Sequence, residues 1–114
     1  MAKIPKNLNE TINSLKQQAL EIIEEATATE MAIFEMFGET EVTLPYLGEV
    51  NNVTNNAEAT YTRLSTLQLR IAKSQPTAAH DMVKLLDETI ASTQARIPAW
   101  ERSIKEVKEE WRLS

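Results

Sequence analysis

Residues 79–111, AHDMVKLLDETIASTQARIPAWERSIKEVKEEW, carry the longest regular hydrophobic pattern in the chain. An α-helix completes a turn in about 3.6 residues, so apolar residues at alternating intervals of four and three gather on one face. The pattern therefore predicts a long helix over residues 77–112 that buries one face along its whole length. That face consists of Ala79, Val83, Leu86, Ile90, Thr93, Ile97, Trp100, Ile104, Val107 and Trp111.

Pro98 lies inside this predicted helix. A proline removes one hydrogen bond of a helix and its ring collides with the preceding turn, so it either kinks the helix or begins a new one. The apolar spacing continues in phase across Pro98, which favours one kinked helix. A separate last helix that completes a four-helix bundle stays open as the alternative.

Two further segments, residues 8–37 and 50–74, show the same helical spacing. The first has a seam of Leu8, Ile12, Leu15, Ala19, Ile22, Ala26, Thr29, Ile33 and Met36, and the second has a seam of Val50, Val53, Ala57, Thr60, Leu64, Leu67 and Ile71. The first segment also has a second apolar row, which is typical of a helix that contacts two neighbours in a bundle. This second row consists of Leu20, Ile23, Met31, Phe34 and Phe37.

The connections between the segments predict the topology. Pro76 disfavours a helical conformation of the residue before it, so the second helix must end near Ser74. The short connection that follows makes the second and third helices antiparallel neighbours. Residues 38–49 form a longer connection, in which the alternation of Val42, Leu44 and Tyr46 predicts an extended segment.

The amino-acid composition supports a helical protein. Two glycines and four prolines in 114 residues supply too little turn chemistry for a sandwich or barrel of strands. No internal repeat divides the chain. The sequence therefore predicts an all-α fold with coiled-coil-like packing: one antiparallel bundle of three long helices over residues 1–114, with the third helix kinked or split at Pro98.

Charge and residue usage exclude several classes of function. The absence of cysteine rules out disulfides, thiolate catalysis and cysteine metal sites. The net charge of −5 comes from 17 acidic and 12 basic residues without a dense basic patch, which disfavours binding to nucleic acids and to anionic membranes. The chain has no apolar run of about 18 residues for membrane insertion and no signal-peptide pattern, so we expect a cytoplasmic protein.

The motifs of catalysis and metal binding are also missing. His80 is the single histidine, whereas carboxylate-bridged metal bundles use two Glu-x-x-His motifs, and Thr77 stands three residues before His80. The acids Glu21, Glu24 and Glu25 flank buried positions and are expected to face solvent. We therefore expect no catalytic site, cofactor or bound metal, and we expect that the protein is not an enzyme.

Unequal helix lengths suggest where a function lies. At about 1.5 Å per residue the three predicted helices measure roughly 45, 37 and 54 Å, so the third should extend about 15 Å beyond its neighbours. The exposed stripe would then form an interface with a second copy, with Trp100, Ile104, Val107 and Trp111 as its residues. This reasoning predicts a non-enzymatic interaction or assembly module that forms a homo-oligomer and presents helix faces to protein partners.

An alternative function uses the aromatic residues at the same end of the bundle. Phe34, Phe37, Tyr46 and Trp100 are expected to come together there and to form an apolar pocket. In that case the protein is a small binding module that holds an apolar ligand or coats an apolar surface. The basic residues Arg63 and Arg70, seven residues apart, are expected to face the glutamates of the first helix.

Overall fold

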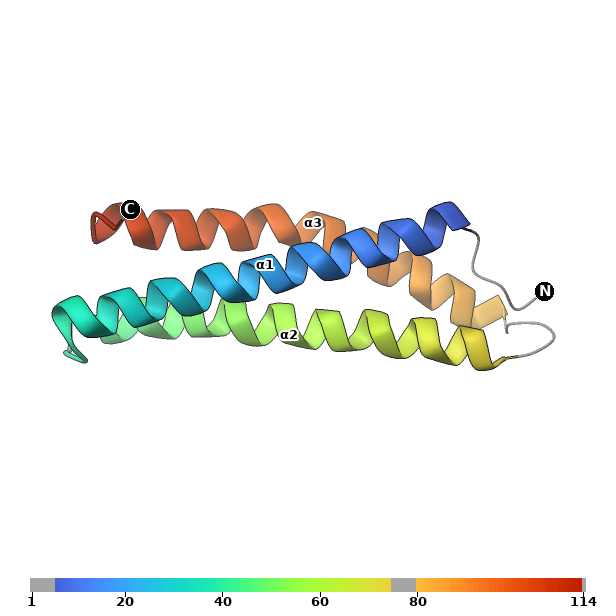
Figure 1. The fold of residues 1–114 in the computed structure, drawn as a ribbon, viewed down its shortest axis with the longest axis horizontal. Helices are drawn as coiled ribbons and strands as arrows, with labels where there is room; N and C mark the ends of the chain where they lie inside the picture. Colours follow the sequence, from blue (N-terminus) through green and yellow to red (C-terminus); the bar gives the residue numbers. More distant parts are fainter. Residues whose placement is uncertain (1–5, 75–79, 114) are drawn as a thin grey trace.

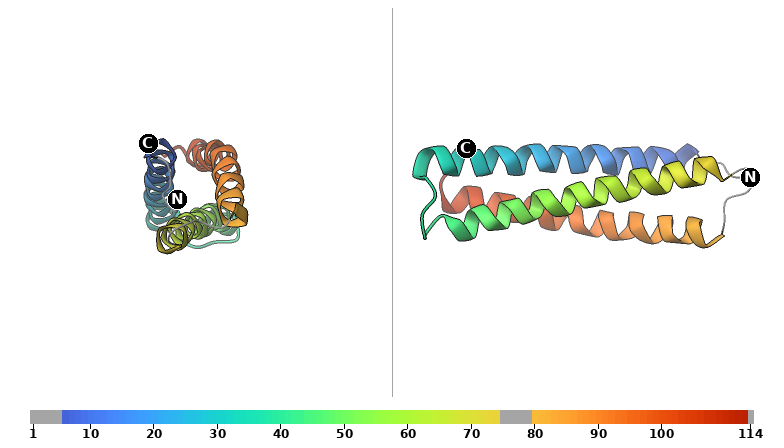
Figure 2. Two further views of the ribbon diagram at one scale, coloured as in Figure 1. Left: turned by 90° about the vertical axis from the view of Figure 1, so that its right-hand side faces the viewer. Right: turned by 90° about the horizontal axis from the view of Figure 1, so that it is seen from below.

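The computed structural model describes residues 6–74 and 80–113, and three helices account for most of them. Helix α1 spans Lys6–Phe37, α2 spans Leu44–Lys73 and α3 spans His80–Glu110. The three helices run up, down and up, side by side, in a rod with extents of 55 × 19 × 17 Å (Figures 1 and 2). The predicted all-α antiparallel bundle is confirmed.

The core of the rod is the set of apolar seams found in the sequence. All seven seam positions of α2 are buried, as are most of those on α1 and α3. Met36 is an exception, because its side chain is 64% exposed. The second row on α1 was predicted to be buried too, and this is wrong for Leu20, Met31, Phe34 and Phe37, which are exposed.

Helix α3 runs without a break through Pro98. The missing N–H of Pro98 leaves the carbonyl of Gln94 without its usual helical partner, and the ribbon of α3 changes direction partway along its length (Figure 1). The kinked continuous helix is therefore confirmed over the described residues. The predicted start of this helix at residues 77–79 lies outside them.

The connection between α1 and α2 is shorter than predicted, because residues 44–49 belong to α2. The extended segment expected over residues 38–49 is therefore wrong. Pro45 stands in the first turn of α2, where a missing N–H costs nothing. Just before it, the hydroxyl of Thr40 accepts hydrogen bonds from the amides of Val42 and Thr43, at 3.2 and 3.1 Å, as an N-cap residue does.

Thr43 completes this cap and ties it to α1. Its hydroxyl accepts a 2.8 Å hydrogen bond from the amide of Thr40, which gives the two threonines the reciprocal geometry of a capping box. The same hydroxyl donates a 2.8 Å hydrogen bond to the carbonyl of Gly38. Gly38 has φ +75° and ends α1 with a bond from its amide to the carbonyl of Phe34. One buried hydroxyl thus joins the end of α1 to the start of α2.

The earlier start of α2 removes the predicted overhang of α3. The three helices contain 32, 30 and 31 residues, so their lengths match. The last turns of α3 are covered by the neighbouring helices, because Ile104 is 3% and Val107 1% exposed. We refer to this end of the bundle, where residues 38–43 connect α1 with α2 and where α3 ends, as the linker end.

The Thr43 hydroxyl should contribute measurably to stability. In Thr43→Val the shape of the side chain is kept while the hydrogen bonds of the hydroxyl are lost, the two at 2.8 Å among them, so we expect the free energy of unfolding to fall by about 1–2 kcal/mol. Urea denaturation followed by circular dichroism measures this change. Thr66→Val, at an exposed position of α2, is the matched control and should change stability little. Equal losses in both variants would contradict the assigned role of Thr43.

Candidate functional site

Exposed apolar side chains are concentrated at the linker end. Among the described residues nine large hydrophobic side chains are exposed, and six of these fall within residues 31–44. We refer to these six as the linker-end surface: Met31, Phe34, Met36, Phe37, Val42 and Leu44. Three of the six, Met31, Phe34 and Leu44, lie together, unlike the scattered single apolar residues found on most protein surfaces.

Part of this surface forms an open groove between α1 and α2. The groove has a volume of about 510 Å³. Helix α1 contributes Met31 and Phe34, and the first turns of α2 contribute the opposite wall. We refer to it as the linker-end groove, and its lining residues are Glu30, Met31, Phe34, Glu39, Leu44, Leu47, Gly48 and Asn51.

The linker-end groove lies in an acidic part of the chain. Residues 30–49 contain five glutamates and no lysine, arginine or histidine. This segment alone accounts for the net charge of −5, because the other 12 acids of the chain are balanced by its 12 bases. Glu30 and Glu39 line the groove itself. A positively charged ligand would therefore be attracted to this end of the bundle.

An aromatic cluster closes the linker end beside α3. The ring of Trp111 lies 4.8 Å from that of Phe37 and 5.3 Å from that of Tyr46, measured between centroids, and the contact with Tyr46 is edge to face. Arg112 ends α3 with φ 54°, and the amide of Leu113 donates a 2.8 Å hydrogen bond to the carbonyl of Lys108. This αL turn ends α3, and the ring contacts of Trp111 with Phe37 and Tyr46 join that end to α1 and α2.

The residues predicted as an interface do not form a free surface. Trp100, Ile104 and Val107 are buried within a single chain, and Trp111 is half-buried in the aromatic cluster. The residues of the predicted apolar pocket are divided among different surroundings. Phe34 lines the linker-end groove, Phe37 and Tyr46 contact Trp111, and Trp100 lies in the core.

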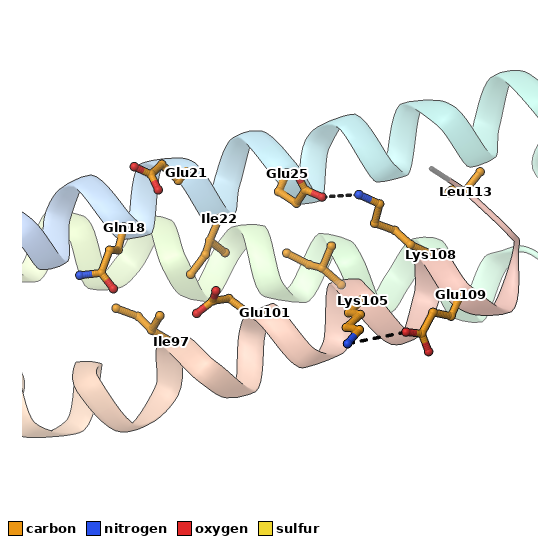
Figure 3. Close-up of a pocket in the computed structure, with 11 residues that line it drawn as sticks. Gln18, Glu21, Ile22, Glu25, Ile97, Glu101, Lys105, Lys108, Glu109 and Leu113 are labelled. Atoms are coloured by element: carbon orange, nitrogen blue, oxygen red, sulfur yellow. Dashed lines mark hydrogen bonds and ion pairs between the residues drawn. The ribbon is translucent and has the colours of Figure 1, made fainter.

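A second groove, of about 490 Å³, lies between α1 and α3 (Figure 3). Its floor contains Ile22, Ile97 and Ile104, which are largely buried. Two ion pairs occupy its rim: Lys108 reaches Glu25 of α1 at 2.5 Å, and Lys105 lies 3.9 Å from Glu109 along α3. The pair of Lys108 with Glu25 links α3 to α1, and both lysines of the groove are used in ion pairs.

The remaining candidates from the sequence lie apart from both grooves or on their rims. The acids Glu21, Glu24 and Glu25 are exposed, and so is His80. Arg63 was expected to face the glutamates of α1, but it lines a recess between α2 and α3. Among the described residues, no ion pair joins Arg63 or Arg70 to a glutamate of α1. Within residues 6–74 and 80–113 no group of three or more histidines, aspartates or glutamates is arranged to hold a metal ion.

The hydropathy of the helices is moderate. None of the helices in the described part of the chain combines the length and the apolar character that a membrane span needs.

Comparison of the chain with models of protein families, with curated proteins and with solved structures gave no match. The function is therefore inferred from the chain's own residues.

Two neighbouring residues of α1 should differ sharply in their effect on stability. Ile33 is fully buried, so Ile33→Ala should lower the free energy of unfolding by about 3 kcal/mol. Phe34 is 53% exposed, and in Phe34→Gln the better helix propensity of glutamine offsets part of the lost contact, so we expect a change below about 1 kcal/mol. Urea denaturation of both variants checks this. A large loss in Phe34→Gln would mean that Phe34 belongs to the core.

Proposed function

We propose that this chain is a non-enzymatic interaction module that binds a protein partner through the linker-end surface. The observation that carries the proposal is the exposure of six large apolar side chains within residues 31–44. Three of them, Met31, Phe34 and Leu44, lie together in the linker-end groove, and contiguous exposed apolar side chains mark interaction sites because leaving them in water is unfavourable. Met31 and Phe34 belong to residue types that are enriched in the cores of interfaces, and methionine adapts its shape to a partner.

The charge of the linker end bears on what the partner is. In a symmetric contact between two copies each groove would meet its equivalent, so the glutamates at residues 30 and 39 would approach those of the other copy. Like charges brought together in this way oppose association. The acidic rim thus favours a different protein as the partner. The homo-oligomer and the cytoplasmic location expected from the sequence remain predictions.

The mass of the protein in solution shows whether apolar attraction or charge repulsion dominates between two copies of the chain. We expect light scattering to give a mass near 12.9 kDa at low salt, and a higher mass at the same concentration in about 1 M salt, where the Debye length shrinks to about 3 Å. A stable dimer at low salt, unaffected by ionic strength, would instead support the homo-oligomer.

A second candidate function is the binding of a small apolar ligand in the linker-end groove. Its volume of about 510 Å³ falls within the range of small-molecule sites. A hydrophobic dye distinguishes the two functions. A ligand site predicts saturable binding of one dye molecule that a lipid or other apolar compound displaces, with no change in the mass of the protein.

Site-specific crosslinking tests the proposed function directly. A photoreactive phenylalanine analogue replaces Phe34 in one variant and Leu20, an exposed apolar residue of the same helix, in a control. In the cells that make the protein, we expect position 34 to give an adduct with one defined protein and position 20 to give none. The purified partner should then bind the wild-type chain and bind a Met31→Lys, Leu44→Lys variant at least about tenfold more weakly. Equal adducts from both positions would contradict the proposal.

A further inference from the structure

We infer that the linker-end groove binds an amphipathic helix that has basic residues beside its apolar stripe, with one bulky apolar side chain seated over Gly48. This inference rests on the proposed function and specifies the class of partner. It is carried by the two glycines of the chain, by the shape of the groove and by its charge.

Gly48 has no evident role within the chain itself. It lies inside α2, where glycine is among the least favourable residues. Its backbone does not adopt a positive φ, and a Cβ atom placed on it would meet no atom of a neighbouring part of the structure within 4 Å. The other glycine, Gly38, is explained by its φ of +75° at the end of α1. The fold therefore needs a glycine at position 38 and has no need of one at position 48.

The position of Gly48 in the groove indicates that it contributes to binding. It lies in the wall of the linker-end groove next to Leu47, opposite the α1 residues Met31 and Phe34. A missing side chain allows another molecule to approach the backbone closely. At Gly48 this leaves room for a large apolar side chain of a partner, flanked by leucine on α2 and by methionine and phenylalanine on α1.

The walls of the groove favour a helix as the occupant. The groove runs between α1 and α2, which lie side by side along the bundle in both views (Figures 1 and 2). A helix of the partner that is laid over this pair inserts its apolar residues, spaced i, i+3/i+4 and i+7, between the side chains of α1 and α2. The described residues contain no strand, so a partner strand would find no sheet edge to extend.

The charge around the groove indicates which residues lie beside the apolar stripe of the partner helix. Glu30 and Glu39 stand beside the apolar residues, and the five glutamates of residues 30–49 have no basic residue among them. Lysine or arginine on either side of the partner's apolar stripe would meet this acidic rim. Complementary charge of this kind speeds association and rejects acidic competitors.

The test uses three synthetic peptides of equal length. The first is a helical peptide with leucine and phenylalanine at i, i+3/i+4 and i+7 and lysine on the flanks; the second carries glutamate in place of lysine; the third has the composition of the first in scrambled order. Fluorescence anisotropy should show that the lysine peptide binds, that added salt weakens it, and that the other two bind at least about tenfold more weakly. Equal binding of the lysine and glutamate peptides would contradict the inference that the partner helix is basic.

Substitutions at Gly48 separate binding from folding. Gly48→Ala should raise the melting temperature, by about 3–6 °C, because alanine favours the helix. Gly48→Leu should stay folded, because open space surrounds this position. The leucine side chain should fill the groove and weaken the binding of the lysine peptide about tenfold or more. Ala59→Leu, at an exposed position of the same helix, is the matched control and should leave binding unchanged.

The outcomes distinguish this inference from the proposed function. If Gly48→Leu binds the lysine peptide as tightly as the wild type, the inference that a side chain of the partner packs over Gly48 is wrong. If no peptide binds while crosslinking at position 34 still captures a defined protein, the helical partner is wrong and the interaction module stands. If both peptide binding and crosslinking fail, the proposed function itself fails.

Discussion

The hydroxyl of Thr43 is the contact on which the geometry of the linker end depends. It receives a hydrogen bond from the amide of Thr40 and gives one to the carbonyl of Gly38, so it holds the last turn of α1 and the first turn of α2 in a fixed relation. Because α2 begins so soon after α1 ends, the helices have matching lengths and α3 finds neighbours along its whole course. The same early turns of α2 supply Leu44 and Leu47 to the groove.

The sequence predicted the buried seams well and the linker end poorly, for physical reasons. Spacing such as that of Leu64, Leu67 and Ile71 defines a face, and any bundle must bury it. The start of α2 was missed because Thr40 and Thr43 form a capping box with threonine where glutamate or glutamine is usual. The alternation of Val42 and Leu44 was then read as extended, although Pro45 is a regular sign of a first helical turn.

Of the residues that line the groove, the sequence placed only Phe34 in a binding site, because periodicity shows which face of a helix is apolar and says nothing of how many neighbours cover it. Three helices bury one seam each, and no fourth element among the described residues covers the second row of α1, so Met31 and Phe34 face solvent. The signal that was present in the sequence was the glutamates around this row. An apolar row beside unpaired acids differs from an ordinary core stripe, and the chain is otherwise balanced in charge.

The aromatic cluster joins residues that are distant along the chain. Phe37 and Tyr46 lie on either side of a short turn and can meet early in folding, whereas Trp111 reaches them only after α3 has crossed the length of the rod. Closing so long a loop costs more conformational entropy than forming the α1–α2 hairpin. The groove is built from α1, α2 and the turn that joins them, so all of its lining residues come from one helical hairpin and none from α3.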